Sequence, residues 1–190
     1  MSSMISIVYF LFSTVISLLT FTLWARIAIR YLRISPLHPI SHTIARLSDP
    51  LVAPFATLIP IKTARQRYDW TALLVLFLVE FIRFTLIGFL FLNHMLPLLL
   101  IVLYALADLV VQPCNLLFYA ILFRVILSWI QPGWRHPLAE VLYQLTEPLL
   151  SMARRVLPQT MNIDFSPVLV IVVLKVITLF IGAFFPVHLL

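Results

Sequence analysis

Charged residues are scarce in this 190-residue chain: Asp, Glu, Lys and Arg make up 11% of it, against about 25% in an average soluble domain. The residues of the AVILMFWYC set make up 63%. This leaves too few polar residues to cover the surface of a domain of this size in water. An ordinary soluble globular fold is therefore excluded, and lipid must replace water around much of the protein.

Cysteine and glycine are also rare. The single cysteine, Cys114, excludes an internal disulfide and any zinc or iron–sulfur site built from several cysteines. Three glycines argue against a glycine-rich phosphate loop, whereas 13 prolines indicate frequent fixed bends. No Gly-x-Ser-x-Gly motif is present. His38 and His42 have the spacing of two helical metal ligands, but Pro39 lies between them and no third ligand follows. We therefore expect no enzyme activity, no metal and no cofactor.

Apolar stretches long enough to cross the membrane, which takes about 20 residues, begin near the N-terminus. Met4–Ala25 contains no charged residue and is predicted to be the first span. No Lys or Arg precedes it, so it lacks the positive start of a cleaved signal peptide, and we expect it to be retained. Trp70–Leu92 and Phe165–Phe185 are predicted as the second and fourth spans, although each contains charge.

The third span is harder to place. The stretch from Met95 to Ile130 is too long for one span and barely long enough for two, and Asp108 and Gln112-Pro113 interrupt it. We predict a true span over 113–130. Residues 97–111 would then lie along the interface or enter the membrane part way. The alternative is five full spans.

The distribution of basic residues favours four spans. Of the 13 Lys and Arg residues, seven fall in 26–67 and three in 135–155. The positive-inside rule places both segments in the cytoplasm, which requires an even number of crossings between them. Four spans with both termini outside satisfy this rule, whereas five would put one basic segment on the wrong side.

The second half of the chain repeats the first. At an offset of 98 residues Arg26 coincides with Arg124, and after Pro60 the offset falls to 95 and pairs Asp69 with Asp164. The other coincidences at the first offset are His38 with His136, Pro39 with Pro137, Leu47 with Leu145, Pro50 with Pro148, Leu51 with Leu149 and Pro60 with Pro158. We predict two parallel repeats, 1–92 and 113–190, separated by a linker or partly inserted helix over 93–112.

Between its two spans each repeat has an amphipathic segment, over 39–60 and 137–158, in which apolar residues recur at helical spacing. Both segments contain a hydroxyl residue, an acid and a proline in succession, which favours a helix start with the hydroxyl as N-cap. We therefore predict two short helices with a sharp joint in each segment, lying in the headgroup layer. The joint residues are Ser48, Asp49 and Pro50 in the first copy, and Thr146, Glu147 and Pro148 in the second.

Three motifs stand out in the second copy: Leu145-Thr146-Glu147-Pro148-Leu149-Leu150, Arg154-Arg155-Val156-Leu157-Pro158 and Ile163-Asp164-Phe165-Ser166-Pro167. They resemble the signature of the YggT family of bacterial integral membrane proteins, and the duplication resembles its two-repeat proteobacterial form. The first copy has Ala56-Thr57 where the family's paired arginines would stand. The resemblance implies an inner-membrane protein linked to osmotic and ion tolerance, with relatives linked to cell division, and no settled activity.

Charges inside the predicted spans are candidate functional residues. Glu80 and Arg83 share one helical face of the second span, and the repeat alignment maps Glu80 onto Lys175 in the fourth. A charge at the bilayer centre costs at least about 2.5–3.5 kcal/mol, so these groups should face the bundle interior and pair. We predict a contact between Glu80 and Lys175, with Arg83 as third member. This contact would either fix the packing of the helices or serve as a binding site for an ion or a proton.

Polar residues near the span ends are the other candidates. We predict that one set of arginines contacts lipid or partner proteins: Arg26, Arg30, Arg33, Arg124, Arg154 and Arg155. The aspartates Asp69, Asp108 and Asp164 are predicted to mark span ends or to cap helices. A basic cluster, Lys62, Arg65 and Arg67, suits an anionic leaflet, and nucleic acid is not expected because no aromatic platform for bases accompanies it.

These features together predict an all-α polytopic membrane protein of four spans in two parallel repeats. The function they favour is a non-enzymatic scaffold or assembly factor that acts through its basic amphipathic helices. We expect anionic lipid and a protein partner or a second copy of the chain as its ligands. The alternative is a small ion-handling transporter or channel that uses the cluster of Glu80, Arg83 and Lys175.

Overall fold

The structure is a computed structural model that describes residues 2–58, 68–91, 96–130, 136–156 and 164–184. These residues form six helices and no strand: α1 (Ser2–Tyr31), α2 (Pro39–Leu58), α3 (Trp70–Phe91), α4 (Leu98–Ile130), α5 (Pro137–Val156) and α6 (Ser166–Phe184). Of these, α1, α3, α4 and α6 are long and apolar enough to cross a membrane. The predicted all-α, four-span fold is confirmed, and the chain is a multi-pass membrane protein.

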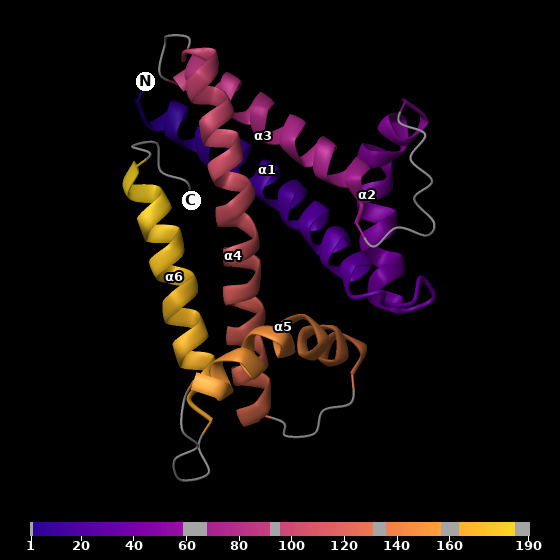
Figure 1. Cartoon of the computed structure of the whole chain (residues 1–190). Helices are drawn as coiled ribbons and strands as arrows, with labels where there is room; N and C mark the ends of the chain where they lie inside the picture. Colours follow the sequence, from indigo (N-terminus) through magenta and orange to yellow (C-terminus); the bar gives the residue numbers. More distant parts are fainter. Residues whose placement is uncertain (1, 59–67, 92–95, 131–135, 157–163, 185–190) are drawn as a thin grey trace.

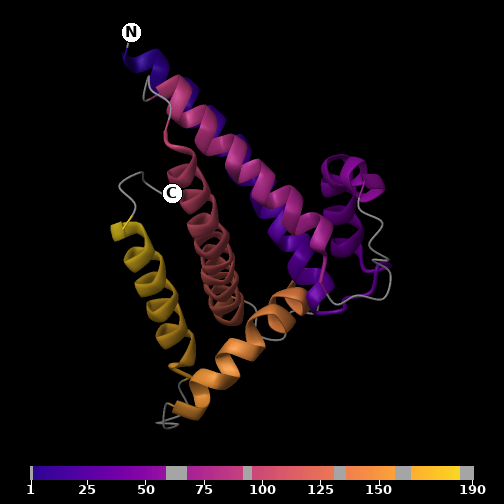
Figure 2. The ribbon, with the colours of Figure 1, turned by 45° about the horizontal axis from the view of Figure 1, so that its top comes forward.

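The four long helices form two pairs, α1 with α3 and α4 with α6, which contact each other through α3, α4 and α1 (Figure 1). The pairs diverge from the end where α4 follows α3 (Figure 2). The first residues of α1 and the last residues of α6 lie at this end, and α2 and α5 lie toward the other. The amphipathic helices therefore share one side of the bundle, as an even number of crossings requires.

Each repeat has its own apolar core, built at equivalent positions. In the first repeat Leu23 of α1 and Val52 of α2 are buried together against α3. In the second, Ile121 of α4 and Leu150 of α5 are buried together against α6, and these residues are the repeat equivalents of Leu23 and Val52. Phe10, at 66% exposure, is among many apolar side chains that remain outside these cores and require lipid contact.

The third span differs from the prediction. Residues 98–112, expected as a linker or partly inserted segment, are the first part of α4, which continues through Pro113 as one helix of 33 residues. Such a helix is about 50 Å long, so it crosses the hydrocarbon core and extends beyond it. An interior proline is tolerated in a membrane helix because neighbouring groups compensate the lost hydrogen bond. Asp108, which suggested the interruption, is instead buried inside the bundle.

The predicted joint in each amphipathic segment is also wrong, because α2 and α5 each run unbroken for 20 residues, through Pro50 and Pro148 respectively. Ser48 donates its Oγ hydrogen to the carbonyl four residues earlier at 2.8 Å, and Thr146 does the same at 2.7 Å. This is the bonding of a hydroxyl inside a helix and not at an N-cap. Contacts with the neighbouring spans, described below, hold the middle of each helix in place.

Some predicted features lie outside the described residues. They are the basic cluster Lys62, Arg65 and Arg67, the prolines Pro60 and Pro158, and the last residues of two predicted spans, Leu92 and Phe185.

Candidate functional site

The side chain of Arg26, in the last part of α1, binds the middle of α2 and the start of α3. Its Nη1 donates to Ser48 Oγ at 2.8 Å and to Asp49 Oδ1 at 2.6 Å. Its Nε donates to Asp69 Oδ2 at 3.1 Å, and Arg30 Nη1 donates to the same oxygen at 2.7 Å. Three helices are thus connected through two arginines.

The second repeat builds the same connection around Arg124 of α4. Its Nη1 donates to Thr146 Oγ1 at 2.8 Å, and its Nη2 donates to Glu147 Oε2 at 2.7 Å. Arg154 of α5 then donates to Glu147 Oε1 at 2.7 Å and to Asp164 Oδ2 at 3.0 Å. We call these two sets the first and second arginine clasps.

The two clasps differ in the origin of their second arginine. In the first clasp it is Arg30 of α1, and in the second it is Arg154 of α5. The repeat equivalent of Arg154 is Ala56, and that of Arg30 is Ser128. In the first repeat, where residue 56 is alanine, Arg30 of α1 supplies the guanidinium that Arg154 of α5 supplies in the second.

The acids of the clasps also fix the starts of the spans. Asp69 Oδ1 accepts the backbone N–H of Ala72 at 3.1 Å, which satisfies one of the open donors at the start of α3. Asp164 Oδ1 accepts the backbone N–H of Ser166 at 3.0 Å at the start of α6. The prediction that Asp69 and Asp164 cap helices at span ends is confirmed.

Two carboxyl groups of the clasps, those of Asp69 and Glu147, have lowered pKa values. Burial alone would raise the pKa of Asp69, but hydrogen bonds from Arg30, a backbone N–H and Arg26 outweigh it and lower that pKa below its usual range. The hydrogen bond from Arg124 lowers the pKa of Glu147. Each clasp is therefore a set of ion pairs at neutral pH.

The predicted lipid contacts of the arginines separate into two groups. Arg26, Arg30, Arg124 and Arg154 bind acids of the protein itself, so their guanidinium groups do not simply extend to the headgroups. Arg33 and Arg155 form no ion pair within the described ranges. A contact between these two arginines and lipid stays a prediction.

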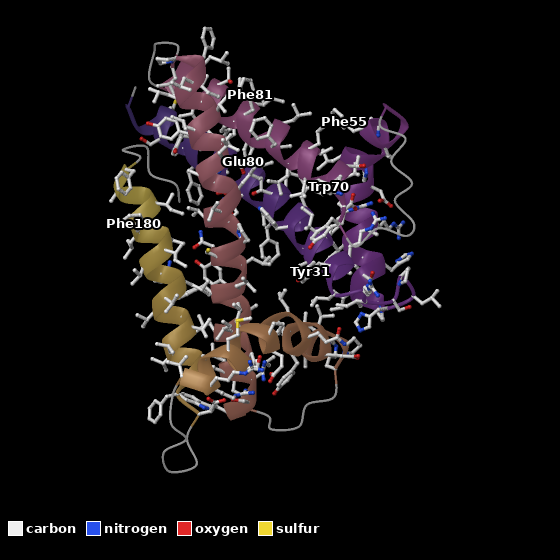
Figure 3. The ribbon with its side chains drawn as sticks, in the orientation of Figure 1. Tyr31, Phe55, Trp70, Glu80, Phe81 and Phe180 are labelled. Carbon is white, nitrogen blue, oxygen red and sulfur yellow. The ribbon has the colours of Figure 1, made fainter. Side chains whose placement is uncertain are left out.

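A second polar group lies inside the membrane, where α3 meets α4 (Figure 3). Arg83 Nη1 donates to Glu80 Oε2 at 3.2 Å and to Asp108 Oδ2 at 2.9 Å. Gln112 Nε2 donates to Asp108 Oδ2 at 3.2 Å. Glu80, Arg83 and Asp108 are at most 2% exposed, and we call these three residues the buried ion cluster.

The predicted contact between Glu80 and Lys175 is therefore wrong. Lys175 lies 4.6 Å from the ring centre of Phe118 in α4 and forms no ion pair among the described residues. Phe118 is ten residues beyond Asp108, which corresponds to about 15 Å along the helix. Arg83 is the partner of Glu80, and Asp108, predicted to mark a span end, is the second acid that Arg83 binds. The sequence signal for it was an acid in an apolar run with Gln112 one helical turn later.

Between the two repeats lies an apolar cavity of about 330 Å³, lined by α1, α2, α4 and α5. Its walls contain pairs of repeat-equivalent positions, including Phe21 with Tyr119 and Ile40 with Leu138. The volume falls in the range of about 300–1,000 Å³ typical of small-molecule pockets, but the walls offer almost no polar group to orient a ligand. The cavity can accommodate an apolar group only.

Comparisons with known proteins agree with this architecture. The sequence model of the CCB3/YggT family matches residues 5–90 and again residues 100–185, one match for each repeat. A protein of Escherichia coli named "Uncharacterized protein YggT" is 34% identical over 90% of this chain and 86% of its own length.

Uncharacterized proteins of Haemophilus influenzae and Pseudomonas aeruginosa are 28% and 27% identical, over 85% and 88% of this chain and 83% and 84% of their own lengths. No solved structure matches the chain. Because the family model covers both hairpins of spans and the E. coli relative is similar along nearly its whole length, the chain belongs to the CCB3/YggT family of membrane proteins.

Proposed function

We propose that the protein is a non-enzymatic scaffold of the bacterial inner membrane. In this role α2 and α5 form a platform at the cytoplasmic surface, where they organise partner proteins next to anionic lipid. The excess of Lys and Arg around both helices supports this sidedness, with both termini outside. A link to osmotic tolerance or cell division, which the family resemblance implies, is part of the proposal.

The observation that carries this proposal is the arginine clasp at the middle of each amphipathic helix. An amphipathic helix that is held at the interface through its apolar face alone can still slide and turn in the plane of the membrane. Arg26 and Arg124 instead tie one hydroxyl and one acid of each helix to a span. Both helices are thereby held at a fixed position and rotation. A fixed surface suits the recognition of a partner, because little ordering is needed on binding.

The outward surface of these helices has groups that a partner can contact. In α5, Met152 and Val156 are 64% and 76% exposed, and in α2 Leu47 is 58% exposed. Arg46 and Arg155 add positive charge beside them. Each basic residue near an anionic leaflet contributes about 1 kcal/mol of attraction.

Photocrosslinking in native membranes tests the platform. A photoreactive amino acid is placed at Met152 or Leu47, and at Leu11 of α1, an exposed residue at the opposite end, as the control position. We expect the same partner protein from both platform positions and none from Leu11. The yield should fall when Arg124→Gln opens the second clasp.

A matched variant separates loss of the clasp from general loss of charge. Lys175→Gln removes one membrane cation outside the clasps, and it should leave the crosslinking yield unchanged. The proposal is contradicted if both platform positions crosslink to lipid alone. It is also contradicted if the partner adduct persists at full yield in Arg124→Gln, because the clasp would then not be needed to hold the platform in place.

Ion handling is the second candidate, favoured by the buried ion cluster in the middle of the spans. Ionisable groups at this depth often belong to ion or proton pathways. Purified protein in liposomes would then pass K⁺, Na⁺ or H⁺, and Asp108→Asn would abolish the flux. Liposomes that pass none of the three ions would exclude this candidate.

A further inference from the structure

The buried ion cluster has two carboxyl groups for one guanidinium. With both carboxyls ionised, Glu80, Arg83 and Asp108 would together carry one net negative charge. Their side chains are 0%, 2% and 1% exposed, so water does not solvate that charge. An uncompensated charge in such a place costs several kcal/mol, which favours any state that neutralises it.

The hydrogen bonds of the cluster locate where neutralisation can occur. Arg83 binds one oxygen of each acid, Glu80 Oε2 and Asp108 Oδ2. The other two oxygens, Glu80 Oε1 and Asp108 Oδ1, are buried and accept no hydrogen bond. Both bonded oxygens accept from the same nitrogen, Arg83 Nη1, so the two carboxyl groups lie next to each other. Two facing carboxylates are both acceptors, so they attract each other only when one of them carries a hydrogen.

We propose that the buried ion cluster is a proton-binding site that holds one proton, shared between Glu80 and Asp108, at neutral pH. Binding converts one carboxylate to a carboxylic acid, whose O–H donates to an oxygen of the other. The net charge of the cluster changes from −1 to zero, and Arg83 keeps a bond to each acid. The proton comes from water and returns to water.

A bound metal cation fits the site less well. Ca²⁺ takes six to eight oxygen ligands and Mg²⁺ requires near-octahedral coordination. Within the described ranges the cluster has two unused oxygens, and Arg83 and Gln112 direct donor N–H groups at the same acids. A proton needs only the two oxygens and no coordination shell.

The surroundings of the cluster are mainly apolar. Phe84 stacks on Tyr104 of α4 with ring centres 5.4 Å apart, and Tyr9 of α1 packs against the same group of side chains. Lys175 of α6 lies on Phe118, too far along α4 to neutralise the acids. In the part of the chain that the structure describes, the charged groups that face one another here are therefore the three members of the cluster.

Among the described residues the site is formed once, at the contact between α3 of the first repeat and α4 of the second. The repeat equivalents of Glu80 and Arg83 are Lys175 and Thr178, and the equivalent of Asp108 is Phe10. The equivalent positions therefore supply no second set of two acids and an arginine. The proposed proton site is independent of the proposed scaffold role, and the proposal holds whether the proton is stored or moved across the membrane.

Infrared spectroscopy of the purified protein in lipid at neutral pH tests the proposal directly. A protonated carboxylic acid gives a C=O stretching band, separate from carboxylate bands, that shifts in D₂O. We expect this band in the wild type. Glu80→Gln and Asp108→Asn should each abolish it, because the remaining carboxylate is then matched by Arg83 and ionises.

Arg83→Gln should act in the opposite direction, because without the guanidinium both carboxyls take up a proton and the band increases to about twice its size. Glu140→Gln, an exposed acid of α5, is the control and should leave the band unchanged. The wild-type spectrum does not depend on how well any variant folds.

The absence of the band from the wild type at neutral pH would overturn the proposal. So would its persistence in both single variants, since the proton would then reside elsewhere. A wild-type band that vanishes on addition of Na⁺ or K⁺ would show that the site prefers a cation, which also contradicts the proposal. A failure of ion flux in liposomes leaves the infrared result unaffected and bears on ion handling alone.

Discussion

The second arginine of the first clasp should be movable from α1 to α2 without loss of the fold. The second repeat places a serine, Ser128, at the equivalent of Arg30, and an arginine, Arg154, at the equivalent of Ala56. The double variant Arg30→Ser with Ala56→Arg therefore gives the first clasp the pattern of the second. Ala56 is exposed, so an arginine there displaces no core side chain.

The size of the effect follows from the bond that is removed. Arg30 donates to Asp69 at 2.7 Å, and the Asp69 side chain is 2% exposed. A hydrogen bond to a charged group contributes about 1.5–3 kcal/mol, and Arg26 keeps its own bond to Asp69, so Arg30→Ser alone should lower the free energy of unfolding by about 2 kcal/mol. In a chain of this length 1 kcal/mol shifts Tm by about 2–4 °C, which predicts a decrease of about 4–8 °C.

Thermal unfolding of the four proteins of this cycle in one detergent is the assay. Ala56→Arg alone should change Tm little, because Asp69 is already paired with two arginines. The double variant should recover at least half of the loss caused by Arg30→Ser. A double variant no more stable than Arg30→Ser would refute the reasoning, because it would show that the two clasps are not interchangeable in geometry.

Three further predictions follow from the same contacts. Stability should fall as pH drops below the ordinary carboxyl range of about 4, because partial desolvation of the exposed Asp164 is outweighed by hydrogen bonds from Ser166 and Arg154, which lower its pKa in the folded state. Asp164→Asn should flatten this part of a plot of Tm against pH. Arg83→Leu should lower the free energy of unfolding by about 3–5 kcal/mol, because two buried acids lose their cation. Lys175→Leu removes only a contact with an aromatic ring, so it should lower the free energy of unfolding by no more than about 2 kcal/mol in the same measurement. Ala25→Phe, which copies the aromatic residue at the equivalent position of the second repeat, should fill part of the cavity between the repeats and raise Tm; a lower Tm would show that the cavity is already occupied by lipid or detergent.

Span number and repeat structure could be predicted because they depend on long-range averages along the chain. Four spans follow from the lengths of the apolar stretches and from the positions of the basic residues, which local irregularities do not change. The duplication follows from matches such as Arg26 with Arg124, which persist at one offset over most of the chain. Both inferences combine many weak signals along the chain, and these signals agree with one another.

The unbroken course of α2 and α5 could not be predicted, because the same local sequence pattern is compatible with two structures. A hydroxyl, an acid and a proline favour an N-cap when the helix starts there. The same residues stand inside a helix when the hydroxyl bonds backward and the acid binds an arginine of another helix. One of the two partners of Glu147, Arg124, is 23 residues away in the sequence, and a local rule contains no information about it.

The ion pair between Arg83 and Asp108 was missed for a related reason. The repeat alignment pairs Glu80 with Lys175, and opposite charges at equivalent depth suggest a contact across the axis. That argument assumes that charges at equivalent positions face each other. The packing of α3 on α4 instead brings Asp108 to Arg83, and Lys175 lies on Phe118.

The comparison of the two repeats separates the two polar sites by function. Both repeats retain a clasp, even though one of its arginines comes from a different helix in each, so the contact itself is what the two halves share. Within the described ranges the buried ion cluster is formed once, between α3 of the first repeat and α4 of the second, and the equivalent positions are Lys175, Thr178 and Phe10, which do not supply two acids and an arginine. Variants of the two sites should therefore have separate effects. Opening a clasp through Arg124→Gln should release α5 while the acid band of the cluster persists, and Asp108→Asn should remove the band while the platform of α2 and α5 keeps its crosslinks.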